Sequence, residues 1–299
     1  MPLTPPSPST VLTTATPTPN ILTLSLPFLR FSRLPIGGRA TVARLPNASL
    51  AVFSPIAYTG AVRAALAAFA GSPAPRVAYI VAPDIEHHLF LSAWKEAFPD
   101  AKVLGPAGLP EKRASSASAA AASPPPAPDQ DAASPRITDI PFDTVFSPLA
   151  RPSVDPLFDS AFSCEFVHAH ANREIVFLHR HDRALIQADL LFNLPATEQY
   201  ARVPPAEYAS LTSGFNGLLY SAFAAFNHMG VDGRSLFLPR VWQYYIAAKD
   251  RKAYRESIRR IAEWDFDSII PCHGDVITTN GKYHFEQVMK WYLDKDKNN

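Results

Sequence analysis

Four stretches of this chain place side chains that can bind a metal ion directly after an apolar run. The carboxylates and imidazoles concerned are Asp84, Glu86, His87, His88, His168, His170, Asp189 and His273. Imidazole nitrogen and carboxylate oxygen are the donors that a hard or borderline divalent ion takes in proteins. Folds of the α/β type build sites at strand ends, because a rigid sheet carries side chains into the loops that follow. The pattern therefore predicts a metal centre.

Two of these stretches, "ALIQADLLF" and "SIIPCHGD", place one candidate ligand each after a short apolar run. The carboxylate of Asp189 would be costly to bury without a cation, a metal ion or backbone donors, and we predict a metal ion. His273 is predicted to be a second ligand, with a loop histidine held by hydrogen bonds as the alternative. Cys272 could be a thiolate ligand or nucleophile, but a single cysteine after a buried strand is more often an inert apolar residue.

The stretch "APDIEHHLFLSAW" joins acidic and imidazole groups to the start of an amphipathic pattern. His87 is a candidate ligand, and a helix-start histidine bonded to a nearby carboxylate is the alternative. Glu86 is either a ligand or a first-turn acid that interacts favourably with the helix dipole. His88 lies about 100° further round such a helix and is expected to be structural.

Composition excludes several classes of protein. The chain has 299 residues and a net charge of +1, with no basic stripe, so nucleic acid is not an expected partner. Its two cysteines suit a reducing compartment, and no apolar run is long enough to span a bilayer. Residues 1–20 are rich in Pro, Thr and Ser, and we expect a disordered tail. Because no acidic residue precedes Asp84, a mitochondrial targeting segment is the alternative to a cytoplasmic protein.

The elements that must position the candidate ligands follow from periodicity and turn signals. Thr59 and Gly71 are the expected start and stop of a helix over "GAVRAALAAFA". "RVAYIVAP" is apolar throughout, as in a strand covered on both faces. The remaining predicted strands are "ATVARL", "LAVFSPI", "AKVLGP", "FSCEFVHAH", "EIVFLH", the run ending at Asp189, and "DSIIPCHGDVI"; the remaining predicted helices lie over "EHHLFLSAWKEAF", 204–229, "AAKDRKAYRESIRRIAEW" and "HFEQVMKWYLDK".

Low-complexity sequence interrupts this order once. Residues 114–136, "ASSASAAAASPPPAPDQDAASPR", are predicted to be a disordered insertion at a loop tip. Strands are expected on both sides of it, so it does not mark a boundary between independent units. We therefore predict a single domain over residues 21–299.

The order of these motifs resembles the metallo-β-lactamase fold superfamily, whose motif His-x-His-x-Asp-His follows a buried strand. More closely, the chain is similar to the DUF4336 group of proteins related to that superfamily. The stretches that carry the resemblance are "GGRATVARL", "EHHLFLSAWKEAFPDAKVLGPAGL", "IVFLHRHDRALIQADLLFNL" and "IIPCHGDVI". The resemblance implies an α/β fold, a four-layer αββα sandwich.

Aligned on that motif, the chain lacks part of the ligand set. Ala82 stands where the first histidine belongs, Asp84 replaces the second histidine, and Glu86 replaces the aspartate. The resemblance implies one divalent metal ion, zinc, iron or manganese, held by the ligands that remain. These are Glu86, His87, Asp189 and His273, with His170 as the loop histidine. His170 is preferred over His168 because its distance to "EIVFL" matches the family loop.

The resemblance also implies a reaction class. A metal-dependent hydrolase of an ester, thioester or phosphoester would take a small-molecule substrate, with Asp84 as general base for the attacking water. Ala82 motivates a second hypothesis, a scaffold that binds a ligand or partner without turnover. A third is an iron-binding redox protein, because the change from histidine to carboxylate favours harder, oxygen-preferring ions.

Overall fold

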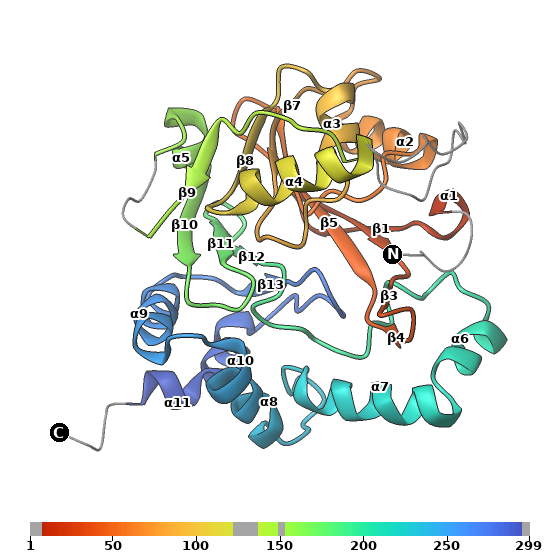
Figure 1. Cartoon of the computed structure of the whole chain (residues 1–299), viewed down its shortest axis with the longest axis vertical. Helices are drawn as coiled ribbons and strands as arrows, with labels where there is room; N and C mark the ends of the chain where they lie inside the picture. Colours follow the sequence, from red (N-terminus) through yellow and green to blue (C-terminus); the bar gives the residue numbers. More distant parts are fainter. Residues whose placement is uncertain (1–7, 122–136, 149–152, 295–299) are drawn as a thin grey trace.

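Two β-sheets lie face to face in the computed structural model of this chain, which describes residues 8–121, 137–148 and 153–294 (Figure 1). The first sheet has the strand order β1-β2-β5-β6-β7-β8-β9 and the second has β10-β11-β12-β13, while β3 and β4 form a separate hairpin. The strands are β1 Thr13–Thr18, β2 Ile21–Leu26, β3 Leu29–Arg30, β4 Leu34–Pro35, β5 Gly38–Arg44, β6 Leu50–Phe53, β7 Val77–Val81, β8 Lys102–Pro106, β9 Thr144–Phe146, β10 Phe162–Val167, β11 Glu174–His179, β12 Ala184–Ile186 and β13 Ser268–Ile270.

Helices cover the outer face of each sheet. The helices of the described residues are α1 Pro8–Val11, α2 Gly60–Ala70, α3 Leu91–Ala97, α4 Leu109–Ala121, α5 Pro156–Ala161, α6 Pro205–Leu211, α7 Gly214–Phe226, α8 Phe237–Trp242, the π-helical turn η1 Gln243–Ala247, α9 Arg251–Ala262, α10 Gly281–Val288 and α11 Lys290–Leu293. Figure 1 shows α2, α3 and α4 on the side of the first sheet and α9, α10 and α11 on the side of the second.

Three apolar cores separate the four layers. One lies between the first sheet and helices α2 and α3, with Leu66 and Trp94 fully buried. A second joins the two sheets, where Phe53 and Phe177 approach to a ring-centroid distance of 4.9 Å. The third lies between the second sheet and helices α9 and α10, around Ile258. Alternate strand residues face opposite sides, so each sheet contributes to two cores.

Parallel strand pairs place the loops that carry the candidate ligands. Strands β6, β7 and β8 run parallel, as do β12 and β13, so the loops that leave each set emerge at one edge of the sheet. Two backbone hydrogen bonds join the loops of the two sheets: Ile175 N donates to Pro83 O at 2.6 Å, and Ile85 N donates to Asn172 O at 3.1 Å. The candidate ligands therefore gather where the two sheets meet.

Most predicted elements are confirmed. Helix α2 begins after Thr59, whose Oγ1 accepts a hydrogen bond from Val62 N, and it ends at Gly71, which has φ 67°. Other boundaries differ from the prediction. Helix α3 begins only at Leu91, and the segment 204–229 is divided into α6 and α7 at Thr212 and Ser213.

The prediction of a disordered tail over residues 1–20 is wrong for residues 8–20. Thr13–Thr18 forms strand β1, paired antiparallel with β2. Threonine favours strands, and β1 lies at the edge of its sheet, where Pro17 is tolerated beside an irregular register. Residues 1–7 lie outside the described part of the chain.

The insertion predicted over residues 114–136 needs a similar correction. Residues 114–121 continue helix α4, because alanine is the strongest helix former and the segment is rich in it. The remainder, residues 122–136, lies outside the described residues. Within the part of the chain that the structure describes, no helix is long and apolar enough to cross a membrane.

Candidate metal centre

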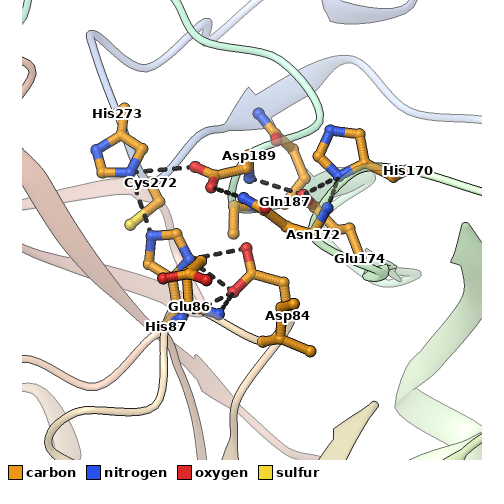
Figure 2. A network of polar contacts seen from close by, with 12 residues as sticks. Asp84, Glu86, His87, His170, Asn172, Glu174, Gln187, Asp189, Cys272 and His273 are labelled. Atoms are coloured by element: carbon orange, nitrogen blue, oxygen red, sulfur yellow. Dashed lines mark hydrogen bonds and ion pairs between the residues drawn. The ribbon is translucent and has the colours of Figure 1, made fainter. Parts of the chain in front are cut away.

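Five side chains from three loops meet at the junction of the two sheets (Figure 2). Asp84 and His87 follow β7, Asp189 follows β12, and Cys272 and His273 follow β13. Ligand atoms of His87, Cys272 and His273 lie within 4.8 Å of one another, and so do ligand atoms of Asp84, His87 and Asp189. His87 belongs to both groups and joins them.

The two histidine rings face each other through one nitrogen each. His87 Nε2 lies 3.2 Å from His273 Nε2. The other ring nitrogens have acceptor partners, since His87 Nδ1 lies 2.9 Å from the Asp84 carboxylate and His273 Nδ1 lies 2.6 Å from Gly37 O. A carboxylate and a carbonyl only accept, so each Nδ1 carries a proton. When both rings are neutral, each directs an Nε2 lone pair at the other, and two lone pairs at this distance repel unless a proton or a metal ion lies between them.

Asp189 adds a third acceptor. Its Oδ2 accepts a hydrogen bond from Asn172 Nδ2 at 2.5 Å, and its Oδ1 lies 3.2 Å from His273 Nε2. Among the described residues, Oδ1 is buried with no hydrogen-bond donor. The turn before it is fixed by Glu174, whose carboxylate accepts the backbone N–H groups of Ala188 and Asp189 at 2.6 and 2.7 Å.

The carboxyl groups in and around the centre are buried. Asp84 and Glu174 have no exposed surface, and Asp189 is 8% exposed. Burial and the neighbouring carboxylates of Asp84 and Asp189 raise the pKa of Glu174 well above its ordinary value. Burial opposes the charge of His87, but the charges of Asp84, Cys272 and Asp189 raise the pKa of His87 well above its ordinary value. The site therefore favours a positive charge at its centre.

The two histidines lower the pKa values of Asp189 and Cys272. Burial would raise the pKa of Asp189, but His87 and His273 hold it well below its usual range. Burial would likewise raise the pKa of the Cys272 thiol, but His87 and His273 lower it to about 7.

A divalent ion fits this arrangement. With both rings neutral, His87 Nε2, His273 Nε2 and Asp189 Oδ1 each direct a lone pair toward one point, and imidazole nitrogen and carboxylate oxygen are ligand types that zinc takes. The second polar atom of each side chain has a hydrogen-bond partner: His87 Nδ1 donates to Asp84, His273 Nδ1 donates to Gly37 O, and Asp189 Oδ2 accepts from Asn172. Such outer partners fix ring tautomer and carboxylate orientation in metal centres.

The structure brings together Asp84, His87, Asp189 and His273 from the predicted set and places the other two members elsewhere. Glu86 pairs with Lys112 Nζ at 2.9 Å, and its side chain is 43% exposed. The ring of His170 is buried against Tyr254, and its Nδ1 accepts a hydrogen bond from Asn172 N at 3.3 Å. Among the described residues, neither joins the two groups around His87.

The local backbone explains the position of Glu86. Asp84 Oδ1 accepts the backbone N–H groups of Glu86 and His87 at 2.7 and 2.8 Å. This turn replaces the predicted first turn of a helix, and it directs His87 inward while Glu86 points toward Lys112. Of the alternatives open for His87, the bond to a nearby carboxylate is present, yet it leaves Nε2 free for a ligand.

Sequence reasoning did not single out Asn172, Gly37 or the inward position of Cys272. Asn172 lies two residues before Glu174, at the start of β11, and no motif marks it. Gly37 acts through its backbone carbonyl, which no residue type reveals. For Cys272, the position beside His273 is the one signal that the sequence offers.

Solved structures of metallo-β-lactamases match nearly the whole chain. The enzyme from Hirschia baltica matches with a TM-score of 0.54 and 7% identity, over 95% of this chain and 99% of its own. The DIM-1 metallo-β-lactamase exposed to ceftazidime matches with a TM-score of 0.52 and 9% identity, over 94% and 97% of the two chains. VMB-1, in a structure at pH 5.5, matches with a TM-score of 0.54 and 10% identity, over 95% of this chain and 97% of its own. No family model and no curated protein sequence matches the chain.

These matches define the class of fold. The chain has the metallo-β-lactamase fold, and the predicted αββα sandwich is confirmed. At such low identity the likeness extends to the fold alone, because one fold hosts many activities. The chemistry of the centre has to be argued from its own residues.

Proposed function

We propose that this protein is a metal-dependent hydrolase of an ester, thioester or phosphoester, with a single divalent ion held by His87, Asp189 and His273. The observation that supports it most is the pair of Nε2 atoms 3.2 Å apart, each on a ring whose Nδ1 is held by an acceptor. A divalent ion bound there would lower the pKa of a water molecule and polarise the scissile bond.

The chain's own residues would prepare this centre. Asp84 holds the Nδ1 proton of His87 and caps the turn that carries it, so we assign it a positioning role in place of the predicted general base. Gly37 O orients the ring of His273, and Asn172 orients the Asp189 carboxylate. Three loops are thereby locked before a ligand arrives, which reduces the reorganisation that binding requires.

Family membership and surroundings are part of the same proposal. Membership of the DUF4336 group rests on the stretches that carry the resemblance. A small-molecule substrate, without nucleic acid or membrane, accords with a net charge of +1. A cytoplasmic location accords with two cysteines that are both free.

One observation favours a second candidate, a binding scaffold without turnover. The side chain of His87 is 15% exposed, while those of Asp189 and His273 are 5% and 4% exposed. A substrate has little direct access to such a centre. Ala82, at the place of the first motif histidine, is fully buried in the core of α2 and α3 and offers no ligand atom.

Hydrolysis of ester, thioester and phosphodiester panels by the zinc- or manganese-loaded protein distinguishes these candidates. We expect turnover that chelation removes, that His273→Ala reduces by at least about 100-fold, and that His181→Ala leaves intact. His181 is a matched control because its side chain is 81% exposed and lies outside the centre. Full metal occupancy with no turnover on any panel would favour the scaffold, and a visible absorption band after aerobic purification would indicate iron instead.

A further inference from the structure

Cys272 lies inside the centre, although a buried lone cysteine is usually an inert apolar side chain. Its Sγ is within 4.8 Å of ligand nitrogens of both His87 and His273. The residue is 4% exposed. Its surroundings are polar, because the thiol also donates to Arg39 O at 3.3 Å. A sulfur atom placed beside two imidazole rings has the composition of a ligand set.

The backbone around Cys272 holds this position firmly. Arg39 Nη1 donates to Pro271 O at 2.6 Å and to Gly274 O at 2.7 Å, the carbonyls on either side of Cys272 and His273. Gly274 has φ 90°, and a Cβ there would collide with the backbone of Asn193. The loop therefore has one conformation that directs both Cys272 and His273 to the same point.

We infer that Cys272 is a ligand of the metal ion, so that the centre is a His87–Cys272–His273 set with Asp189 beside it. The inference rests on the proposed function, since it needs an ion at the two histidines. On binding, the Cys272 S–H bond breaks, the proton leaves to solvent, and the sulfur electron pair binds the ion with no change of oxidation state.

This assignment changes the expected metal. Thiolate sulfur is a soft donor that favours zinc, cobalt and copper(I), whereas carboxylate and water favour manganese. A centre of two imidazoles and one thiolate therefore selects zinc from the zinc, iron and manganese that the sequence leaves open. With two imidazoles and one thiolate bound, the fourth tetrahedral position is left for Asp189 or for a water molecule.

Cobalt substitution tests the assignment in the full-length protein. Wild type, Cys272→Ser and Cys164→Ser are stripped of metal with a chelator and then titrated with Co²⁺. Cys164→Ser is the matched control, because Cys164 lies on β10 outside the centre. We expect a near-ultraviolet thiolate-to-cobalt absorption band in wild type and Cys164→Ser. In Cys272→Ser the band should be lost, and the Zn²⁺ affinity should fall by at least about tenfold.

X-ray absorption of the zinc-loaded wild type gives the same answer without a variant, should Cys272→Ser fail to fold. One sulfur neighbour at about 2.3 Å is expected. Stoichiometric metal with only nitrogen and oxygen neighbours, and no sulfur band, would overturn the role of Cys272 and leave the proposed function standing. Failure of wild type to bind Co²⁺ or Zn²⁺ at all would overturn both.

Discussion

Replacing Asp84 with asparagine tests whether the centre depends on Asp84 rather than on Glu86. In the folded protein, Asp84 Oδ1 accepts the backbone N–H groups of Glu86 and His87, and both carboxylate oxygens lie 2.9 Å from His87 Nδ1. Asparagine has nearly the same shape and keeps one acceptor oxygen. It presents an amide N–H₂ where the second oxygen lay, and it removes the negative charge.

The size of the effect follows from what His87 must do. Asparagine has one acceptor oxygen and no charge, so it holds His87 less firmly in the tautomer that leaves Nε2 free for a metal ion. Loss of such an outer partner costs about 10- to 100-fold in metal affinity, which is about 1.4 to 2.7 kcal/mol of binding free energy. Glu86→Gln makes the same chemical change two residues away, where the side chain is 43% exposed and paired with Lys112. Its effect on metal affinity should stay within about twofold.

Competition between each variant and a chromophoric chelator for Zn²⁺ measures both effects at one pH. We expect wild type and Glu86→Gln to bind alike and Asp84→Asn to bind more weakly. Circular dichroism of the apo proteins checks that all three are folded. The opposite order, with Asp84→Asn unchanged and Glu86→Gln unable to bind, would contradict the structure and restore Glu86 as the ligand that the motif alignment implies.

Three further predictions concern the framework. Burial would raise the pKa of Asp155, but Lys102 and the N-terminus of α5 lower it to about 2. Asp155→Ala should therefore cost about 1 kcal/mol of unfolding free energy at pH 7. This difference between wild type and variant should vanish as the pH falls from about 4 to about 2, because the carboxylate is then protonated. Gly274→Ala should lower the melting temperature more than Gly233→Ala, because both have positive φ but only Gly274 lacks space for a Cβ. Arg39→Met should cost at least about 2 kcal/mol in urea denaturation, because it leaves buried carbonyls without donors.

Each of these has an outcome that would contradict it. A pH-independent deficit in Asp155→Ala would mean that the carboxylate is not ionised in the folded protein at low pH. Equal melting temperatures for the two glycine variants would mean that the loop after β13 yields easily. An unchanged denaturation midpoint in Arg39→Met would remove the basis for a rigid loop around Cys272 and His273.

Elements with local signals could be predicted from the sequence. The Thr59 cap, the Gly71 stop and the apolar strand before Asp84 each depend on neighbours within a few residues, and each is present. Asp189 and His273 were also recognisable, because a carboxylate or imidazole directly after a buried strand needs a partner.

Features that depend on distant residues could not be predicted. The carbonyl of Gly37 that holds His273 lies 236 positions away in sequence. Asp84 can cap a turn or begin a helix, and only the tertiary contacts of the loop decide between them. Strand β1 was missed for a similar reason, since its Pro- and Thr-rich sequence acquires order only by pairing with β2.

Metal content of the purified full-length protein tests the central claim most directly. Wild type, Glu86→Gln and His87→Ala/His273→Ala are dialysed with Zn²⁺, washed free of unbound ion, and measured by inductively coupled plasma mass spectrometry. The facing Nε2 atoms of His87 and His273 predict about one equivalent of metal in wild type and in Glu86→Gln, and almost none in the double variant. Wild type without metal, or a double variant that retains a full equivalent, would contradict the account.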